Sequence, residues 1–345
     1  MYFYLFFTLL KMKKIIALFA IFFGYSNDAF SQDQPIKIEG TAQGTTYHIS
    51  YYDESNRNFQ PEIETLLKNF DLSVSTYIPN SVISRINRNE KNIILDSYFI
   101  TCFKKAKEVW KNTNGAFDPT VYPLVNAFGF GPEKKKKLSQ KEIDSVLQFV
   151  GFDLIELKGK KIVKKDPRVR LDFNAFAQGY SVDVISQFLI SKKCSSFMVE
   201  IGGEVYAKGK KSNGDKWSVG IEKPIDNKET QNPINVIAEI EDLAIASSGD
   251  YRRFFIEDGI KYAHHIDPKT GYPTKNNLLS ASVFAKDCIT SDAYATGILV
   301  MGLGKAKLFL EKHPEIQVYL IYSDENGNYA EFQTSQMESI LKEVE

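Results

Sequence analysis

The spacing of apolar residues changes from segment to segment along this chain, and this change of period most limits the possible folds. Residues 36–52 alternate polar with apolar and carry β-branched and aromatic side chains around Gly40 and Gly44, which predicts two strands joined by a turn. Residues 61–70 repeat their apolar positions every three or four residues after a proline, which predicts a helix. No internal repeat or long low-complexity linker separates these segments. The sequence therefore predicts one compact α+β unit of mixed sheets and helices, with two lobes and an active site between them as the alternative.

The remaining apolar patterns predict further elements of both kinds. Amphipathic or small-residue helices are expected over residues 98–110, 139–150, 175–190, 291–301 and 305–311. Strands are expected as two short segments within 161–172, at 197–201, within the Gly- and Pro-interrupted stretch 217–255, and at 317–322.

The first 31 residues differ from the rest of the chain. A cationic patch (Lys11, Lys13 and Lys14) precedes the apolar run 15–23, and a more polar stretch ends at Ala29-Phe30-Ser31. This order is typical of a secretory signal peptide that is cleaved before Gln32, and the apolar run is short for a membrane span of ~20 residues. An uncleaved N-terminal membrane anchor is the alternative. Residues 32–345 would then form the exported domain.

Composition excludes several classes of protein. Hydrophobic residues make up 43% and charged residues 25%, so neither global disorder nor a fibrous fold is expected. The 43 basic residues equal the 43 acidic residues, which argues against a dedicated nucleic-acid binder. The three cysteines are too few and too scattered for a disulfide framework or a zinc site, and at most one disulfide is possible.

Five polar clusters occur where a packed core needs none. The first pairs Gly44-Thr45-Thr46 with Ser75-Thr76-Tyr77, and its hydroxyls and amides suit either a phosphate or ribose, or ordinary turns. In the second, residues 115–120, Asp118 precedes a proline, so its carboxylate is expected to project from a fixed turn, with turn punctuation as the alternative. In the third, residues 171–180, small residues open a helix after Asp172, an arrangement that suits anion binding or a helix cap.

The other two clusters contain histidine and acidic residues. Residues 247–253 and 264–271 place serines, arginines and adjacent histidines around a rigid Asp-Pro turn, which favours phosphate chemistry. In the last cluster, residues 290–296, Asp292 and Thr296 are four residues apart and share one helix face. Two oxygen donors suit Mg²⁺, whereas a dipole-complementing acid and a threonine bonded to its own helix are the alternative.

Taken together and in this order, the clusters resemble the ApbE family of FAD:protein FMN transferases from about residue 36 to the end. The most specific segments are Asp-x-x-Ala-x-Ala-x-Gly-Tyr, His-x-Ile-Asp-Pro-x-Thr-Gly-x-Pro and Ser-Asp-Ala-x-Ala-Thr. The resemblance implies an ApbE-like (T-fold-like) unit in the periplasm or on the periplasmic face of the inner membrane. It also implies an Mg²⁺-dependent enzyme that cleaves FAD, releases AMP and attaches FMN through a phosphoester to a Thr or Ser of an acceptor protein, expected to be a membrane redox-complex subunit.

The resemblance also assigns site residues. It implies a metal held by Asp292, Thr296 and the carbonyl of Ala175, with His264 assisting deprotonation of the acceptor hydroxyl. The FAD site would be lined by Gln43, Tyr77, Ala116, Phe117, Asp118, Asp172, Gln178 and Ile266, with Tyr77 or Phe117 stacking on the isoalloxazine.

Two positions depart from the family pattern. Gln178 stands where many members carry Lys, and Glu200 stands where Asn is usual. The loss of one positive charge near the nucleotide motivates one alternative, an exported FAD-binding carrier. A second alternative is an Mg²⁺-dependent FAD pyrophosphatase that uses water as the acceptor.

Overall fold

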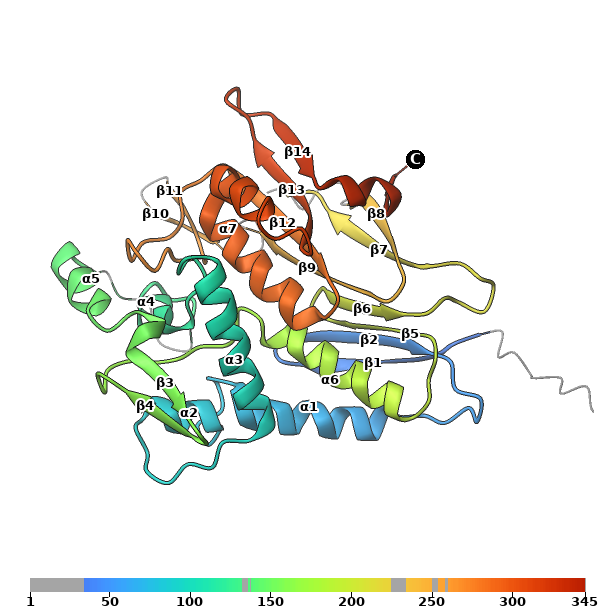
Figure 1. Cartoon of the computed structure of the whole chain (residues 1–345), viewed down its shortest axis with the longest axis horizontal. Coiled ribbons are helices and arrows are strands. Elements are labelled where there is room, and N and C mark those ends of the chain that lie inside the picture. The colour runs from blue at the N-terminus through green and yellow to red at the C-terminus, as the bar shows by residue number, and fades with distance from the viewer. Residues whose placement is uncertain are drawn as a thin grey trace, which may run out of the picture.

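An eight-stranded antiparallel sheet forms the centre of the computed structural model, which describes residues 34–131, 136, 138–224, 234–249, 254–257 and 260–344 (Figure 1). The predicted signal peptide or anchor, residues 1–31, lies outside the described residues. The strand order is β1-β2-β5-β6-β9-β12-β13-β14. The strands span Ile36–Ala42 (β1), Thr45–Tyr51 (β2), Phe197–Ile201 (β5), Glu204–Lys208 (β6), Leu243–Gly249 (β9), Leu278–Ala285 (β12), Gln317–Ser323 (β13) and Tyr329–Gln333 (β14).

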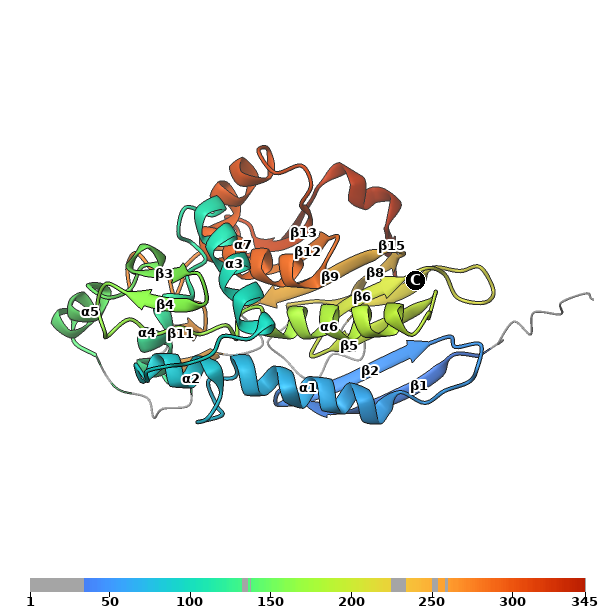
Figure 2. The same cartoon turned by 60° about the horizontal axis from the view of Figure 1, so that its bottom comes forward.

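Helices cover one face of this sheet, and a second sheet covers part of the other (Figure 2). On the helical face lie α1 (Gln60–Val74), α3 (Ser97–Asn112), α6 (Ala177–Ser191) and α7 (Cys288–Leu310). On the other face lies the antiparallel sheet β15-β8-β7, formed by Leu341–Glu343, Ile234–Ile240 and Trp217–Glu222, with the 3₁₀ helix η3 (Ser335–Ser339) beside it.

The alternation of side chains in β12 and β13 accounts for the two layers. Val283 of β12 and Leu320 of β13 pack with α3 and α7, whereas Phe284 and Tyr319 pack with Trp217 of the second sheet. Because successive residues of a strand point to opposite faces, strands that are apolar at every position need cover on both sides.

Apart from α3, the elements between α1 and α6 in the sequence gather at one end of the molecule (Figure 1). They comprise α2 (Val82–Asn87), η1 (Pro119–Val121), α4 (Tyr122–Ala127), α5 (Gln140–Leu147), η2 (Phe152–Leu154) and the hairpin of β3 (Ile155–Lys158) and β4 (Lys161–Lys164). Phe152 and Ile155 of this part share one hydrophobic cluster with α3, α7 and β12. The hairpin of β10 (Phe254–Glu257) and β11 (Ile260–Ala263) completes the described elements.

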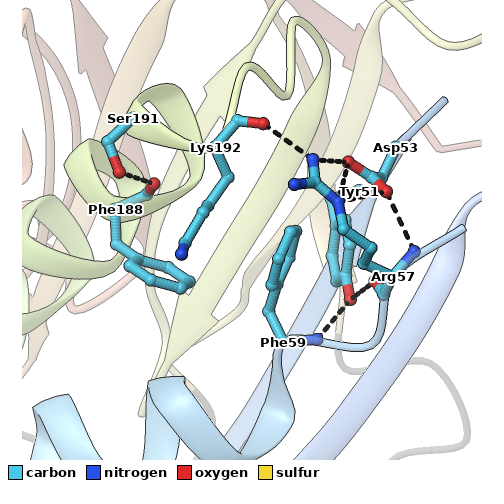
Figure 3. Close-up of polar contacts among 7 residues, drawn as sticks. All are labelled: Tyr51, Asp53, Arg57, Phe59, Phe188, Ser191 and Lys192. Carbon is cyan, nitrogen blue, oxygen red and sulfur yellow. Dashed lines mark hydrogen bonds and ion pairs between the residues drawn. The ribbon is translucent and has the colours of Figure 1, made fainter. Parts of the chain in front are cut away.

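A polar and aromatic cluster ties α6 to the start of α1 at the far end of α6 (Figure 3). The Arg57 guanidinium pairs with Asp53, lies 4.9 Å from the Phe59 ring centroid and donates to the Lys192 carbonyl at 3.0 Å. The Tyr51 hydroxyl accepts a hydrogen bond from the Phe59 amide at 3.0 Å. This cluster follows the carboxyl end of α6, a helix of ~22 Å, and therefore fixes α6 from the end opposite to the polar clusters.

Most predicted elements are confirmed, with two corrections. Of the two short strands expected within 161–172, only β4 lies there, and its partner β3 precedes that range. Residues 165–172 form no strand, because this segment instead bonds to neighbouring loops. The helix expected from residue 291 begins at Cys288, because Asp287 caps it by accepting the Thr290 amide at 3.0 Å. The predicted interruption between residues 301 and 305 is a single non-helical residue, Gly302.

Among the described residues, only α7 is long and apolar enough to cross a membrane. It is also a core helix, because most of its first three turns are buried against α6, β9 and β12. Cys102, Cys194 and Cys288 are buried and unpaired, so the described part of the fold is held by its core without a disulfide.

Candidate active site

Three contacts at intervals of one helical turn join the amino-terminal part of α6 to α7. The Thr296 hydroxyl donates to the Ala175 carbonyl oxygen at 3.2 Å, and the Gly179 amide donates to Asp292 Oδ2 at 2.9 Å. One turn further on, Asp183 accepts hydrogen bonds from the amides of Cys288 and Ile289, both at 2.8 Å. Each step of four residues along α6 matches a step of four residues back along α7, so the segments are antiparallel and in fixed register.

Gly179 makes this close approach possible. A Cβ atom at this position would lie 2.5 Å from the Cys288 carbonyl oxygen and 2.7 Å from the Asp292 Cβ. Distances this short are incompatible with any side chain. The glycine in the Asp-x-x-Ala-x-Ala-x-Gly-Tyr segment therefore serves helix contact.

Three kinds of oxygen donor meet at this junction, namely the Ala175 carbonyl, the Asp292 carboxylate and the Thr296 hydroxyl. Burial raises the pKa of Asp292, and the nearby Asp183 carboxylate raises it further, against the Gly179 hydrogen bond. Neither carboxylate forms an ion pair with the described residues. A buried acid with oxygen donors one turn away suits a hard divalent cation.

The structure does not support the alternatives that the sequence left open for Asp292 and Thr296, namely an acid that complements the dipole of its own helix and a threonine bonded to its own helix. Because α7 starts at Cys288, Asp292 lies in the second turn and accepts an amide at the start of α6 rather than of its own helix. Thr296 donates its hydroxyl to Ala175, a carbonyl of another segment, rather than to its own helix. The Asp292 contact links α7 to α6, and the Thr296 contact links α7 to the turn that precedes α6.

The turn between β1 and β2 lies beside α6. Gln43 adopts a left-handed φ of 54° in this turn, and its side-chain oxygen accepts the Ser181 hydroxyl at 3.3 Å. Gln178 and Thr45 both lie next to Gly202: a Cβ atom added to Gly202 would be 2.7 Å from the Gln178 amide nitrogen and 3.0 Å from the Thr45 methyl group. The two glutamines assigned to FAD by the resemblance are therefore on the same side of α6.

An open pocket of about 660 Å³ lies at this turn, lined by residues 41–46 and Asp71. Burial raises the pKa of Asp71 to about 6, and the Gln43 amide beside it acts in the opposite direction. The sequence reasoning did not identify Asp71, since an acid in the last turn of an amphipathic helix gives no signal of its own.

The third cluster contacts the second through its backbone and the first through the Asn174 side chain. The Asp172 amide donates to the Pro119 carbonyl at 3.0 Å, and the Asn174 side chain donates to the Thr76 hydroxyl at 3.2 Å. Burial raises the pKa of Asp172 to about 6, against hydrogen bonds from Asn174. Segments 75–77, 118–120 and 172–174 therefore lie next to one another, just before the start of α6.

The Asp118 carboxylate does not project from its turn as expected. It faces inward, accepting the Thr120 amide at 2.8 Å, the Thr120 hydroxyl at 2.6 Å and the Phe152 amide at 3.0 Å. Burial raises its pKa to about 6 despite these donors. Asp118 thus shapes the turn that carries Ala116, which is partly exposed.

The two aromatic candidates for flavin stacking differ in exposure. The Phe117 ring is 2% exposed and packs edge-to-face on Phe176 with centroids 5.5 Å apart, so the expectation that it stacks on isoalloxazine is wrong. Tyr77 is 55% exposed.

The Asp-Pro turn carries His264 and Ile266. The partly buried His264 ring lies with its centroid 6.1 Å from that of Phe130 and 3.8 Å from that of His265. Ile266 is buried with Leu124 and Ile143, and its backbone pairs with Pro273. Residues 250–253 of the same cluster lie outside the described residues.

Two contacts bring the fourth cluster toward the others. A Cβ atom added to Gly115 would lie 3.9 Å from Lys269 Cε. The Ser248 hydroxyl lies 3.3 Å from the Thr296 hydroxyl. Sequence reasoning also missed Asp183, which is one turn after Gly179 and could have been found from that spacing.

Comparison with known proteins agrees with this fold. The model of the ApbE family matches residues 43–320. An FAD:protein FMN transferase from Haemophilus influenzae is 37% identical over 92% of this chain and 95% of its own length. The structure of the flavin transferase ApbE from Vibrio cholerae is 34% identical, with a TM-score of 0.81 over 89% of this chain and 99% of its own. The apo flavinyl transferase ApbE of Pseudomonas stutzeri is 26% identical, with a TM-score of 0.79 over 89% and 97%. The chain belongs to the ApbE family.

Proposed function

We propose that this protein is an Mg²⁺-dependent FAD:protein FMN transferase. It cleaves the pyrophosphate of FAD and joins FMN to a Thr or Ser hydroxyl of an acceptor protein, with release of AMP. The observation that carries the proposal is the junction of α6 and α7, where oxygen donors of Ala175, Asp292 and Thr296 meet beside the turn carrying Gln43.

The residues of the junction have the chemistry that Mg²⁺ requires. A carbonyl, a carboxylate and a hydroxyl leave room for waters and for substrate phosphate oxygens, as magnesium sites in enzymes usually do. When bound there, the ion would neutralise charge that moves onto the AMP leaving group. Asp292 and Thr296 would hold it from α7, and the Ala175 carbonyl from the start of α6.

The nucleotide would lie across the exposed parts of segments 75–77, 115–116 and 172–178. Tyr77 offers an exposed ring for the isoalloxazine, whereas Gln43 and Gln178 offer amide groups on the adjoining side. The oxygen of the acceptor hydroxyl attacks the FMN phosphorus, the bond from that phosphorus to the AMP oxygen breaks, and His264 takes the hydroxyl proton.

We also propose that the chain is exported, with residues 1–31 acting as a signal peptide or anchor. An exported enzyme of this kind would modify a flavin-bearing subunit of a membrane electron-transfer complex. Mass spectrometry of a co-expressed subunit tests this, because attached FMN adds a fixed mass at one Thr or Ser. An unmodified subunit would exclude that acceptor.

A single experiment separates the transferase from its alternatives. The purified protein is incubated with FAD and Mg²⁺, with and without an acceptor protein, while AMP is measured by chromatography and covalent flavin by in-gel fluorescence. A transferase yields AMP together with a fluorescent acceptor, and a pyrophosphatase yields AMP without one. A carrier, which the neutral Gln178 would favour, binds FAD and releases no AMP.

A further inference from the structure

Asp183 lies outside every motif discussed so far, yet it is the third of the contacts between α6 and α7. Its two carboxylate oxygens accept the first two amides of α7, from Cys288 and Ile289, both at 2.8 Å. Amides at the start of a helix have no partner within that helix, so a carboxylate from elsewhere is a favourable acceptor.

The arrangement is reciprocal. Asp183 of α6 accepts amides at the start of α7, and Asp292 of α7 accepts the Gly179 amide at the start of α6. Asp183 and Gly179 are four residues apart on one helix, and Cys288 and Asp292 are four apart on the other. Two carboxylates therefore fix one register, and a slip of either helix would break both contacts.

We infer that Asp183 is a positioning residue for the divalent cation, because it holds α7 in the register that aims Asp292 and Thr296 at the Ala175 carbonyl. This inference rests on the proposed function for the identity of the site. It concerns only how this chain places its own oxygen donors.

Asp183 is not needed simply to cap the amino terminus of α7, because another residue already caps it. Asp287 caps the same helix from within its own segment, accepting the Thr290 amide at 3.0 Å. Without Asp183 this local cap remains, and what is lost is the link to α6 one turn from Asp292.

Asp287 therefore provides a matched control. Asp183→Ala and Asp287→Ala each remove one carboxylate from the amino terminus of α7, but only the first cuts the link between the helices. Asp183→Asn keeps the side-chain volume but replaces one accepting oxygen with an NH₂ group, which then faces a backbone N–H of α7. It serves as the milder variant if Asp183→Ala folds poorly.

The test is Mn²⁺ binding to the full chain, followed by the EPR signal of free Mn²⁺, together with the thermal unfolding midpoint of each variant. We expect Asp183→Ala and Asp183→Asn to weaken Mn²⁺ binding at least 10-fold, whereas Asp287→Ala changes it less than 2-fold even where it lowers the midpoint equally. Equal weakening in all variants, or none in the Asp183 variants, would overturn the inference.

The wild-type protein separates this inference from the proposed function. Wild type that binds Mn²⁺ but releases no AMP from FAD contradicts the enzyme activity and leaves the positioning role to be judged by the variants. Wild type that binds no Mn²⁺ removes the cation site and, with it, the role assigned to Asp183.

Discussion

The Thr296 hydroxyl meets the Ala175 carbonyl oxygen at 3.2 Å, although 121 residues separate them in the sequence. The contact exists because α6 and α7 pack side by side, with their positions fixed by Gly179 and two carboxylates. The fold thus creates a site whose donors come from two distant segments.

Replacing Asp292 tests the proposed cation site directly. Asp292→Ala removes the only carboxylate among the three proposed ligands and should lower Mg²⁺-dependent AMP release at least ~100-fold, because metal stabilisation of a transition state is worth several kcal/mol. The measurement is AMP formed from FAD as Mg²⁺ is varied. An unchanged rate would remove Asp292 from the metal role.

His264→Ala should separate binding from transfer. The variant should bind FAD as the wild type does, yet transfer FMN ~10²- to 10⁴-fold more slowly, because loss of a general base affects proton removal and not nucleotide binding. FAD binding is followed by flavin fluorescence, and transfer by the labelled acceptor. Transfer at the parental rate would mean that another group accepts the proton.

Gln178→Lys restores a positive charge beside the proposed nucleotide site. A charge near the surface is worth about 1 kcal/mol, so FAD should bind roughly 5-fold more tightly at low salt, and the gain should shrink as salt is added. Titration of flavin fluorescence at two ionic strengths measures both effects. Gln178→Leu is the neutral control, and a similar gain there would show that charge is not the cause.

Gly179→Ala should force α6 and α7 apart. The new methyl group would lie 2.5 Å from the Cys288 carbonyl oxygen, so a loss of ~1–3 kcal/mol in the free energy of unfolding is expected from overpacking. Urea denaturation measures it. Gly304→Ala is the control: nothing lies within 4 Å of its added Cβ, and its helical position predicts a small gain in stability. Equal behaviour of the two variants would contradict the close packing.

Asp118 predicts a pH dependence of stability. Its folded pKa, about 6, lies above the unfolded value, so its protonated form is favoured by folding. Its contribution is fully present below about pH 4 and is lost as the pH rises through 6, by at most ~1.4 kcal/mol per pH unit. Urea denaturation of wild type and Asp118→Asn from pH 4 to 7 tests this. The variant should show the flatter dependence, and parallel curves would assign the titration elsewhere.

The sequence predicted elements better than contacts. The alternation in β1 and β2 and the apolar spacing of α1 and α3 were sufficient, because these elements place one face on a core and the other toward solvent. The short elements α2 and α4 carry no full period and were missed. The hairpin of β3 and β4 was placed too late, since its residues 155–164 are largely charged.

The site was predicted as a set of residues and not as an arrangement. The spacing of Asp292 and Thr296 predicted a shared helix face, but nothing local indicated that Ala175 lies opposite, which depends on helix packing. The inward orientation of Asp118 likewise depends on Phe152, and the burial of Phe117 depends on Phe176. Both partners lie outside the segment 115–120, so that segment alone could not predict these contacts. Long-range packing decides which member of a motif faces a ligand.

Gly302 divides α7 into two parts that need not share one axis. With φ of 72° and ψ of 165°, it leaves the helical conformation, and the Asn276 side chain takes over by donating to the Leu299 carbonyl at 2.9 Å. A residue inserted after this break would rotate the stretch that leads to β13 without turning Asp292 or Thr296. Evolution can therefore lengthen or reshape the carboxyl-terminal part of this protein while the chemistry upstream keeps its geometry.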